Sequence, residues 1–253
     1  MNDVKGLTTG HWQWSGWLTP KGRAIALFAL LKFDEENVWL LLQDADPAEL
    51  AGRLQRFVFR SKVSIAVRDD LHATGMFGRP ALAAAARLSV ADDGEVALDL
   101  GGAGGDRGLR IVATDAAADT DALARWTAFD LAHGLPHLSP SQSEQWTPQQ
   151  LSLDRLQAYS VKKGCYPGQE IVARTHFLGQ AKRGLVLFES DALLAPGTQI
   201  GDGERAIGSI VSVAVSGERP LALAVLPLEP ASAPLQADGV ALRPAPLLDG
   251  LAR

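Results

Sequence analysis

The stretch VKKGCYPGQEIVAR, Val161–Arg174, places the only cysteine of this 253-residue chain between two glycines and beside two lysines. Gly164 and Gly168 permit tight turns and close approach to the main chain, so we expect Cys165 on a firmly held loop. The sequence also changes character just beyond this stretch, because helical and strand-like patterns precede it and only short strand-like runs follow it. It therefore marks a boundary in the fold and carries the first candidate for chemistry.

Positive charge surrounds this cysteine. Residues 162–183 carry five Lys and Arg residues against the single acid Glu170, a local charge of +4 in a chain whose net charge is −5. Lysines near the sulfur would favour its thiolate form, and the cations suit an acidic ligand. The residues alone equally permit a small apolar cysteine in a turn beside solvated lysines, so both interpretations stay open.

The composition is that of a globular protein, with 47% hydrophobic residues to form a core. One cysteine excludes an internal disulfide, and the start of the chain has no signal-peptide pattern, which favours a cytoplasmic location. The longest apolar run, Ala24–Leu31, is too short to cross a membrane. The negative net charge argues against general nucleic-acid binding.

The region before residue 180 combines strand and helix patterns. The expected strands are Ala24–Phe33, Val38–Gln43, Val63–Val67, Glu95–Leu100 and Leu109–Thr114. The expected helices run from Pro47, capped by Asp46, to about Arg60, and over Arg79–Leu88 and Asp119–Ala132. This order predicts an α+β fold in residues 1–179, with antiparallel sheets flanked by helices in two ferredoxin-like halves.

The last part of the chain lacks a helical period. Leu185–Phe188, Ala206–Val213 and Leu221–Leu226 are short strand-like runs divided by glycine and proline. Residues 180–253 are therefore predicted to form a small β-barrel.

Other chemistry-bearing residues give weaker patterns. His133, His137 and His176 lack the spacing that would join Cys165 in a zinc site, so no metal site is predicted. The glycines of Gly101–Gly105 lead into a strand, which indicates a hairpin loop rather than a nucleotide-binding loop. Four aromatic residues suit either stacking on a flat heterocycle or core packing, namely Trp126, Trp146, Tyr166 and Phe177.

A family resemblance rests on the longer stretch KKGCYPGQEIVARTHFLGQAKRG, residues 162–184, which resembles the signature of the YgfZ family. This family comprises folate-binding relatives of the glycine-cleavage aminomethyltransferase. GWLTPKGR at 16–23, Trp146-Thr-Pro and LSLDRL at 151–156 support the resemblance. It implies a helix-flanked antiparallel first region followed by a small β-barrel.

The resemblance implies binding of tetrahydrofolate or a derivative, and support of iron–sulfur cluster assembly or repair. Cluster-dependent enzymes, including those that thiolate tRNA, would then depend on the protein. The implied partners are a reduced folate, iron–sulfur assembly proteins and client enzymes, with transient contact to a cluster. Direct nucleic-acid binding and membrane association are not implied.

The site residues follow from the signature. Cys165 is the candidate reactive thiol, with Lys162 beside it. The candidate folate contacts are Tyr166, Gln169, Glu170, Arg174 and Glu144. A carboxylate at Glu170, or alternatively at Glu144, suits the donor edge of a pterin, while the cations suit folate's glutamate tail.

Two departures from the family bear on function. The start, MNDVKGL, resembles a segment that follows an N-terminal strand and helix in the family, so an exposed sheet edge or an open folate cavity is expected. Arg23–Phe33 lacks the acid that would assist one-carbon transfer. An accessory maturation factor is therefore favoured over a folate-dependent aminomethyltransferase or demethylase, and an interaction module without a ligand is the third alternative.

Overall fold

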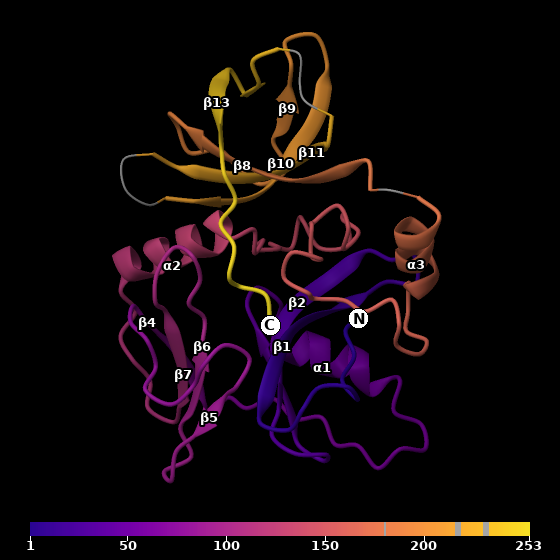
Figure 1. Ribbon diagram of the computed structural model, residues 1–253, viewed down its shortest axis with the longest axis vertical. Coiled ribbons are helices and arrows are strands. Elements are labelled where there is room, and N and C mark those ends of the chain that lie inside the picture. Colours follow the sequence, from indigo (N-terminus) through magenta and orange to yellow (C-terminus); the bar gives the residue numbers. More distant parts are fainter. Residues whose placement is uncertain (180, 216–218, 230–232) are drawn as a thin grey trace.

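The computed structural model describes residues 1–179, 181–215, 219–229 and 233–253, and places three sheets around a shared core (Figure 1). The first sheet is antiparallel, with the order β1 (His11–Leu18), β2 (Ala24–Lys32) and β3 (Val38–Leu42). Helix α1 (Pro47–Gln55) follows, and Asp46 caps it by accepting a hydrogen bond from the Glu49 amide at 2.7 Å. The predicted hairpin and the predicted helix start are both confirmed.

The second sheet is also antiparallel, in the order β4-β7-β6-β5. Its strands are β4 (His72–Met76), β5 (Ser89–Val90), β6 (Val96–Asp99) and β7 (Gly108–Val112). Helix α2 (Thr120–Ala132) begins at the cap Asp119, as predicted, and lies between this sheet and the barrel (Figure 1).

Helix α3 (Gln169–Phe177) precedes the last part of the chain, which forms a closed barrel in the order β10-β11-β8-β13-β12-β9. Its strands are β8 (Arg183–Ser190), β9 (Gln199–Gly201), β10 (Ala206–Ala214), β11 (Leu221–Pro227), β12 (Gln236–Ala237) and β13 (Val240–Ala245). The expected barrel is confirmed, whereas the predicted domain boundary falls on Gln180, outside the described residues.

Three barrel strands, β8, β10 and β11, are apolar on both faces, which joins the barrel to the rest of the molecule. On β11, Leu223 and Val225 belong to the large core shared with the sheets, while Ala222 and Ala224 belong to the barrel's own core. Successive side chains of a strand point to opposite faces, and β8 and β10 likewise contribute to both cores.

The chain returns from the barrel to the first sheet. Leu251 is buried, and its carbonyl accepts a hydrogen bond from the Trp14 indole at 2.7 Å (Figure 1). The glycine-rich loop between β6 and β7 lies against this returning segment, since the Ala103 amide donates to the Asp249 carbonyl. A Cβ on Gly102 would lie 2.7 Å from His133, so the loop needs glycine for packing and not for a ligand.

Three predicted elements differ from the structure. Helix α1 ends at Gln55 and not near Arg60, where aromatic and β-branched residues favour helix less. Val63–Val67 pairs with no described strand and is largely exposed, because no sheet edge meets it. Arg79–Leu88 is not a helix, since its backbone bonds to the first sheet, the Trp12 amide donating to the Ala86 carbonyl at 2.8 Å.

The bond between Trp12 and Ala86 also bears on the exposed sheet edge that the sequence predicts. Besides Ala86, the Met1 nitrogen donates to the Gly16 carbonyl at 2.6 Å, so described residues cover the edge of β1 at two places. The expectation of an exposed edge is thus wrong for these positions, where local backbone satisfies the strand.

Candidate functional site

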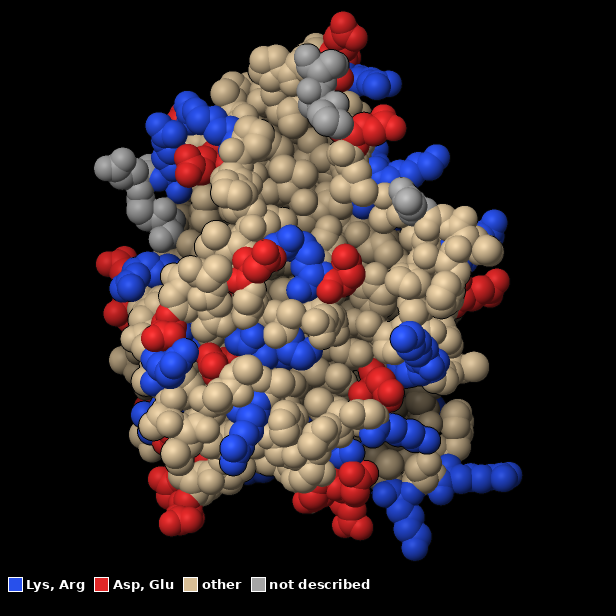
Figure 2. All heavy atoms as spheres, in the orientation of Figure 1, with Lys and Arg blue, Asp and Glu red and all other residues tan. Residues whose placement is uncertain are grey.

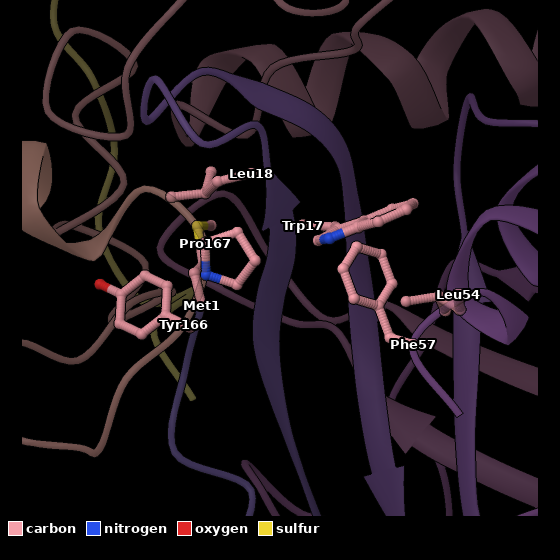
Figure 3. Close-up of a pocket in the computed structure, with 7 residues that line it drawn as sticks. All are labelled: Met1, Trp17, Leu18, Leu54, Phe57, Tyr166 and Pro167. Carbon is pink, nitrogen blue, oxygen red and sulfur yellow. The ribbon is translucent and has the colours of Figure 1, made fainter. Parts of the chain in front are cut away.

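A groove of about 740 Å³ lies where β1, the turn after it, α1 and the loop at Glu144 meet. A smaller pocket of about 290 Å³ shares Trp17, Leu18, Phe57 and Pro167 with it (Figure 3). A third hollow of about 520 Å³ shares Arg53 and Glu144 with the groove. Because they share lining residues, the three hollows adjoin one another and together make up the candidate site.

An aromatic pair lines the groove. The rings of Trp17 on β1 and Phe57, just after α1, meet edge to face with centroids 6.0 Å apart. Figure 3 shows Tyr166 and Pro167 on the opposite side of the smaller pocket from this pair. Such surfaces suit the faces of a planar heterocycle.

Glu144 provides the one carboxylate among the described residues that line the groove. Its backbone has φ 63°, and its amide donates to the Ala24 carbonyl at 2.8 Å, which fixes the residue against β2. Positive φ is unfavourable for a glutamate and is often found at functional sites. The side chain is 46% exposed and pairs with Arg53 at 3.1 Å.

Four cations line the groove together with this carboxylate, namely Lys21, Arg23, Arg53 and Arg56. Arg23 is fixed by bonds to the Gln145 carbonyl at 2.6 Å and to the Gln150 side chain at 3.1 Å. Figure 2 shows Lys and Arg side chains gathered at the lower right, where Figure 1 shows the loop that follows α1. The groove therefore combines aromatic faces, one acid and a cationic rim.

The signature stretch reaches this groove through backbone packing. Gly168 has φ 80°, and a Cβ there would lie 2.6 Å from the Cα of Gly22 and from the Thr19 carbonyl. Its glycine thus allows the signature loop to pack on the early LTPKGR turn, not on a ligand. This contact brings Tyr166 and Pro167 into the pocket walls.

Lys163 contacts Tyr166 and the start of the chain. Its ammonium lies 5.1 Å from the Tyr166 ring centroid and donates to the Asn2 carbonyl at 2.9 Å. Burial lowers the pKa of Lys163, and the nearby charge of Asp3 partly opposes this. Burial also raises the pKa of Tyr166. Lys163 therefore anchors the loop, while Lys162 is exposed.

The other predicted site residues lie outside the described pocket walls. Cys165 is exposed, as are Glu170 and Arg174 on α3. The Gln169 side chain donates to the Lys163 carbonyl at 3.3 Å. Of the predicted residues, the structure thus brings Tyr166 and Glu144 to the groove system, and the roles assigned to all of them stay predictions.

Sequence reasoning missed Trp17, Arg53 and Phe57. They belong to β1, to α1 and to the residues just after α1, far from the signature in sequence. The only available signal was an aromatic and cationic run at 56–60, RFVFR. Their convergence depends on how the first sheet packs on the signature loop.

His137 and Trp126, two of the residues weighed in the sequence analysis, make structural contacts. His137 bridges Asp44 at 2.8 Å and Asp130 at 3.0 Å, and Trp126 packs on the Arg107 guanidinium. Within the described ranges, no three His, Cys, Asp or Glu residues are arranged to hold a metal ion. Likewise, no helix among them is long and apolar enough to cross a membrane.

Comparison with known proteins identifies relatives. No family model matches the chain. The tRNA-modifying protein YgfZ of Klebsiella pneumoniae is 29% identical over 235 residues, covering 83% of this chain and 72% of that protein. The protein of the same name from Cronobacter sakazakii is 31% identical over 184 residues, which cover 65% and 56% of the two chains. The chain is a YgfZ homologue. The resemblance expected from the signature is confirmed.

Further similarities define how far this relationship extends. An uncharacterized protein of Haemophilus influenzae is 30% identical over 191 residues, covering 74% of this chain and 64% of that protein. The YgfZ homologue thus spans less than two thirds of two of these three relatives. The glycine cleavage system aminomethyltransferase T of Bartonella henselae has a similar structure, with a TM-score of 0.65 at 12% identity over 97% of this chain and 76% of that one. The expected aminomethyltransferase fold is confirmed.

Proposed function

We propose that this YgfZ homologue binds a reduced folate of the tetrahydrofolate class in the groove beside Glu144. The main support for this proposal is that the Glu144 carboxylate lines the same groove as the Trp17–Phe57 pair and several cations. A pterin has flat apolar faces and a donor edge, and its folate form ends in glutamate carboxylates. The groove offers a complement to each of these parts.

Different residues of the groove contact different parts of the ligand. Glu144 accepts hydrogen bonds from the amino-pyrimidine edge, and Trp17 with Phe57 contacts the ring faces. Lys21 and Arg56 face the carboxylates at the open rim. The bound folate would supply one-carbon carrier chemistry.

Isothermal titration with tetrahydrofolate tests this assignment. Glu144→Gln is expected to weaken binding by about ten-fold or more, because an amide cannot match a carboxylate accepting two hydrogen bonds. Glu170→Gln is the matched comparison, since Glu170 is the alternative pterin contact and lies exposed on α3. If Glu170→Gln abolished binding and Glu144→Gln did not, the pterin site would belong to the signature helix.

The second part of the proposal concerns Cys165. An exposed thiol on a loop anchored by Gly168 is accessible to a protein partner. Iron–sulfur clusters are usually held by several cysteines, so one thiol suits transient contact with a cluster whose other ligands belong to the partner. We therefore assign the protein a role in iron–sulfur assembly or repair, through which tRNA-thiolating and other cluster enzymes depend on it.

Cells that lack the native protein provide the test of the thiol. Cys165→Ser is expected to lose most of the restoration of cluster-dependent tRNA thiolation, while tetrahydrofolate binding by the purified variant stays within about two-fold of normal. Ser160→Ala, a change in the same loop region, serves as a comparison for local disturbance. Full restoration by Cys165→Ser would remove the thiol from the mechanism.

The one-carbon transferase alternative has less support. Strand β2 occupies Ala24–Lys32, contains no acid and is buried along its whole length. It therefore offers no carboxylate for proton movement at a reacting nitrogen. Absence of one-carbon transfer from methylated amines to tetrahydrofolate is the expected result in a turnover assay.

A further inference from the structure

We propose that Arg53 makes the groove selective for folates that carry a glutamate tail, because it competes with the pterin for Glu144 and then binds the tail. This inference rests on the proposed folate binding. It concerns which folates bind, and it assigns a ligand-selecting role to Arg53, a residue outside the signature.

Arg53 contacts two of the groups that a pterin would use. Its guanidinium lies 3.1 Å from Glu144 and 5.1 Å from the centroid of the Trp17 ring. A weaker contact at 3.5 Å joins it to Glu49, one turn earlier on α1. In the free protein, Arg53 thus neutralises the carboxylate and covers an aromatic face.

The arrangement can be exchanged at low cost. The Arg53 side chain is 34% exposed and that of Glu144 is 46% exposed, so their ion pair is solvated and weak. A pterin edge that bonds to Glu144 releases the guanidinium beside the other cations of the rim. Because Arg53 lies in the last turn of α1, only its long side chain has to turn.

The charge of the ligand then decides the outcome. A pterin without a tail must displace Arg53 and gains nothing from the released cation. A folate with glutamate carboxylates regains an ion pair from Arg53 after displacement. Removal of Arg53 should therefore change the affinities for these two ligands in opposite directions, whereas an ordinary tail-binding cation affects only one of them.

The experiment is isothermal titration of the full-length protein with 6-methyltetrahydropterin, tetrahydrofolate and its γ-linked triglutamate, at low and at moderate salt. Arg53→Ala is expected to tighten binding of the methylpterin by about three-fold and to weaken the triglutamate by about ten-fold, with both effects smaller at higher salt. In a Glu144→Gln background the tightening should disappear, because no carboxylate is left to compete for.

Arg56→Ala is the matched control, since Arg56 lines the same groove and has no ion pair with Glu144 within the described part of the chain. It should weaken the triglutamate and leave methylpterin affinity unchanged. Thermal unfolding checks that each variant is folded. If Arg53→Ala does not fold, Arg53→Lys replaces it in the experiment. Arg53→Lys should keep most of the affinity for the glutamate tail and should pair more weakly with Glu144.

The outcomes distinguish failure of this inference from failure of the proposed folate binding. If the native protein binds the folates but Arg53→Ala shifts all ligands in one direction, or shifts none, Arg53 is not selective and folate binding stands. If the native protein binds none of the three ligands, the proposed function fails and this inference fails with it.

Discussion

Replacing Arg107 with alanine is expected to lower the free energy of unfolding by about 3–5 kcal/mol, the largest loss we expect from a single substitution in this chain. Arg107 is fully buried, and its guanidinium bonds to Asp130 at 2.6 Å. It also lies 4.0 Å from the Trp126 ring centroid and 4.1 Å from that of Phe129. The substitution removes one partner of the Asp130 carboxylate, whose side chain is only 1% exposed. It also opens a cavity between the rings of Trp126 and Phe129.

Urea unfolding followed by circular dichroism measures this loss, and further variants separate charge from packing. Arg107→Met keeps most of the volume between the rings, so its cost reports the loss of Arg107 as a partner of the Asp130 carboxylate, which then keeps only His137. Arg107→Met combined with Asp130→Asn should cost less than Arg107→Met alone, because the carboxylate that loses Arg107 is then replaced by a neutral amide. A loss below about 1 kcal/mol for Arg107→Ala would mean that the buried pair contributes little.

Stability is also expected to fall as the pH rises from about 7 to about 10. Burial alone would lower the pKa of His137, but hydrogen bonds to Asp130 and Asp44, with their charges, raise it to about 10. A histidine whose folded pKa lies above its unfolded value near 6.5 stabilises the protein fully below that value. The contribution, on the order of 3–5 kcal/mol, is then lost as the pH passes through the folded value.

Comparison with His137→Gln isolates this effect from other groups that titrate at high pH. Unfolding free energies at pH 6, 8 and 10 should show a large difference between the two proteins at pH 6 and a small one at pH 10. A constant difference across this range would show that His137 is not charged in the folded protein at neutral pH. The backbone of His137 also bonds to Ser212 on β10, and the substitution leaves these backbone bonds in place.

The best sequence predictions were those with a local cause. Asp46 and Asp119 cap helices because a side-chain oxygen bonds to a free amide within the same turn, a pattern visible in the sequence. The β2–β3 hairpin follows from two apolar runs around a polar turn. The segment 79–88 failed for the opposite reason, because bonds to β1 outweighed its alanine-rich helix propensity.

The same distinction applies to the candidate site. The signature residues could be found by resemblance, and Tyr166 does lie in a pocket wall. The groove itself depends on Trp17, Arg53 and Glu144, which lie 36 and 91 residues apart along the chain and contact one another only after folding. No local pattern predicts such a convergence, because it depends on long-range packing.

By itself, the sequence determined the helix caps, the barrel, the family and the suspicion that Cys165 is reactive. The tertiary structure alone decided that Gly168 packs on the early turn and that Glu144 lies beside Arg53 and an aromatic pair. It also decided that Arg107 pairs with Asp130 on α2 and that His137 joins Asp130 to the barrel through Ser212. The physical reason is range: capping and periodicity act within a few residues, whereas burial and ion pairing depend on which distant segments share the same space.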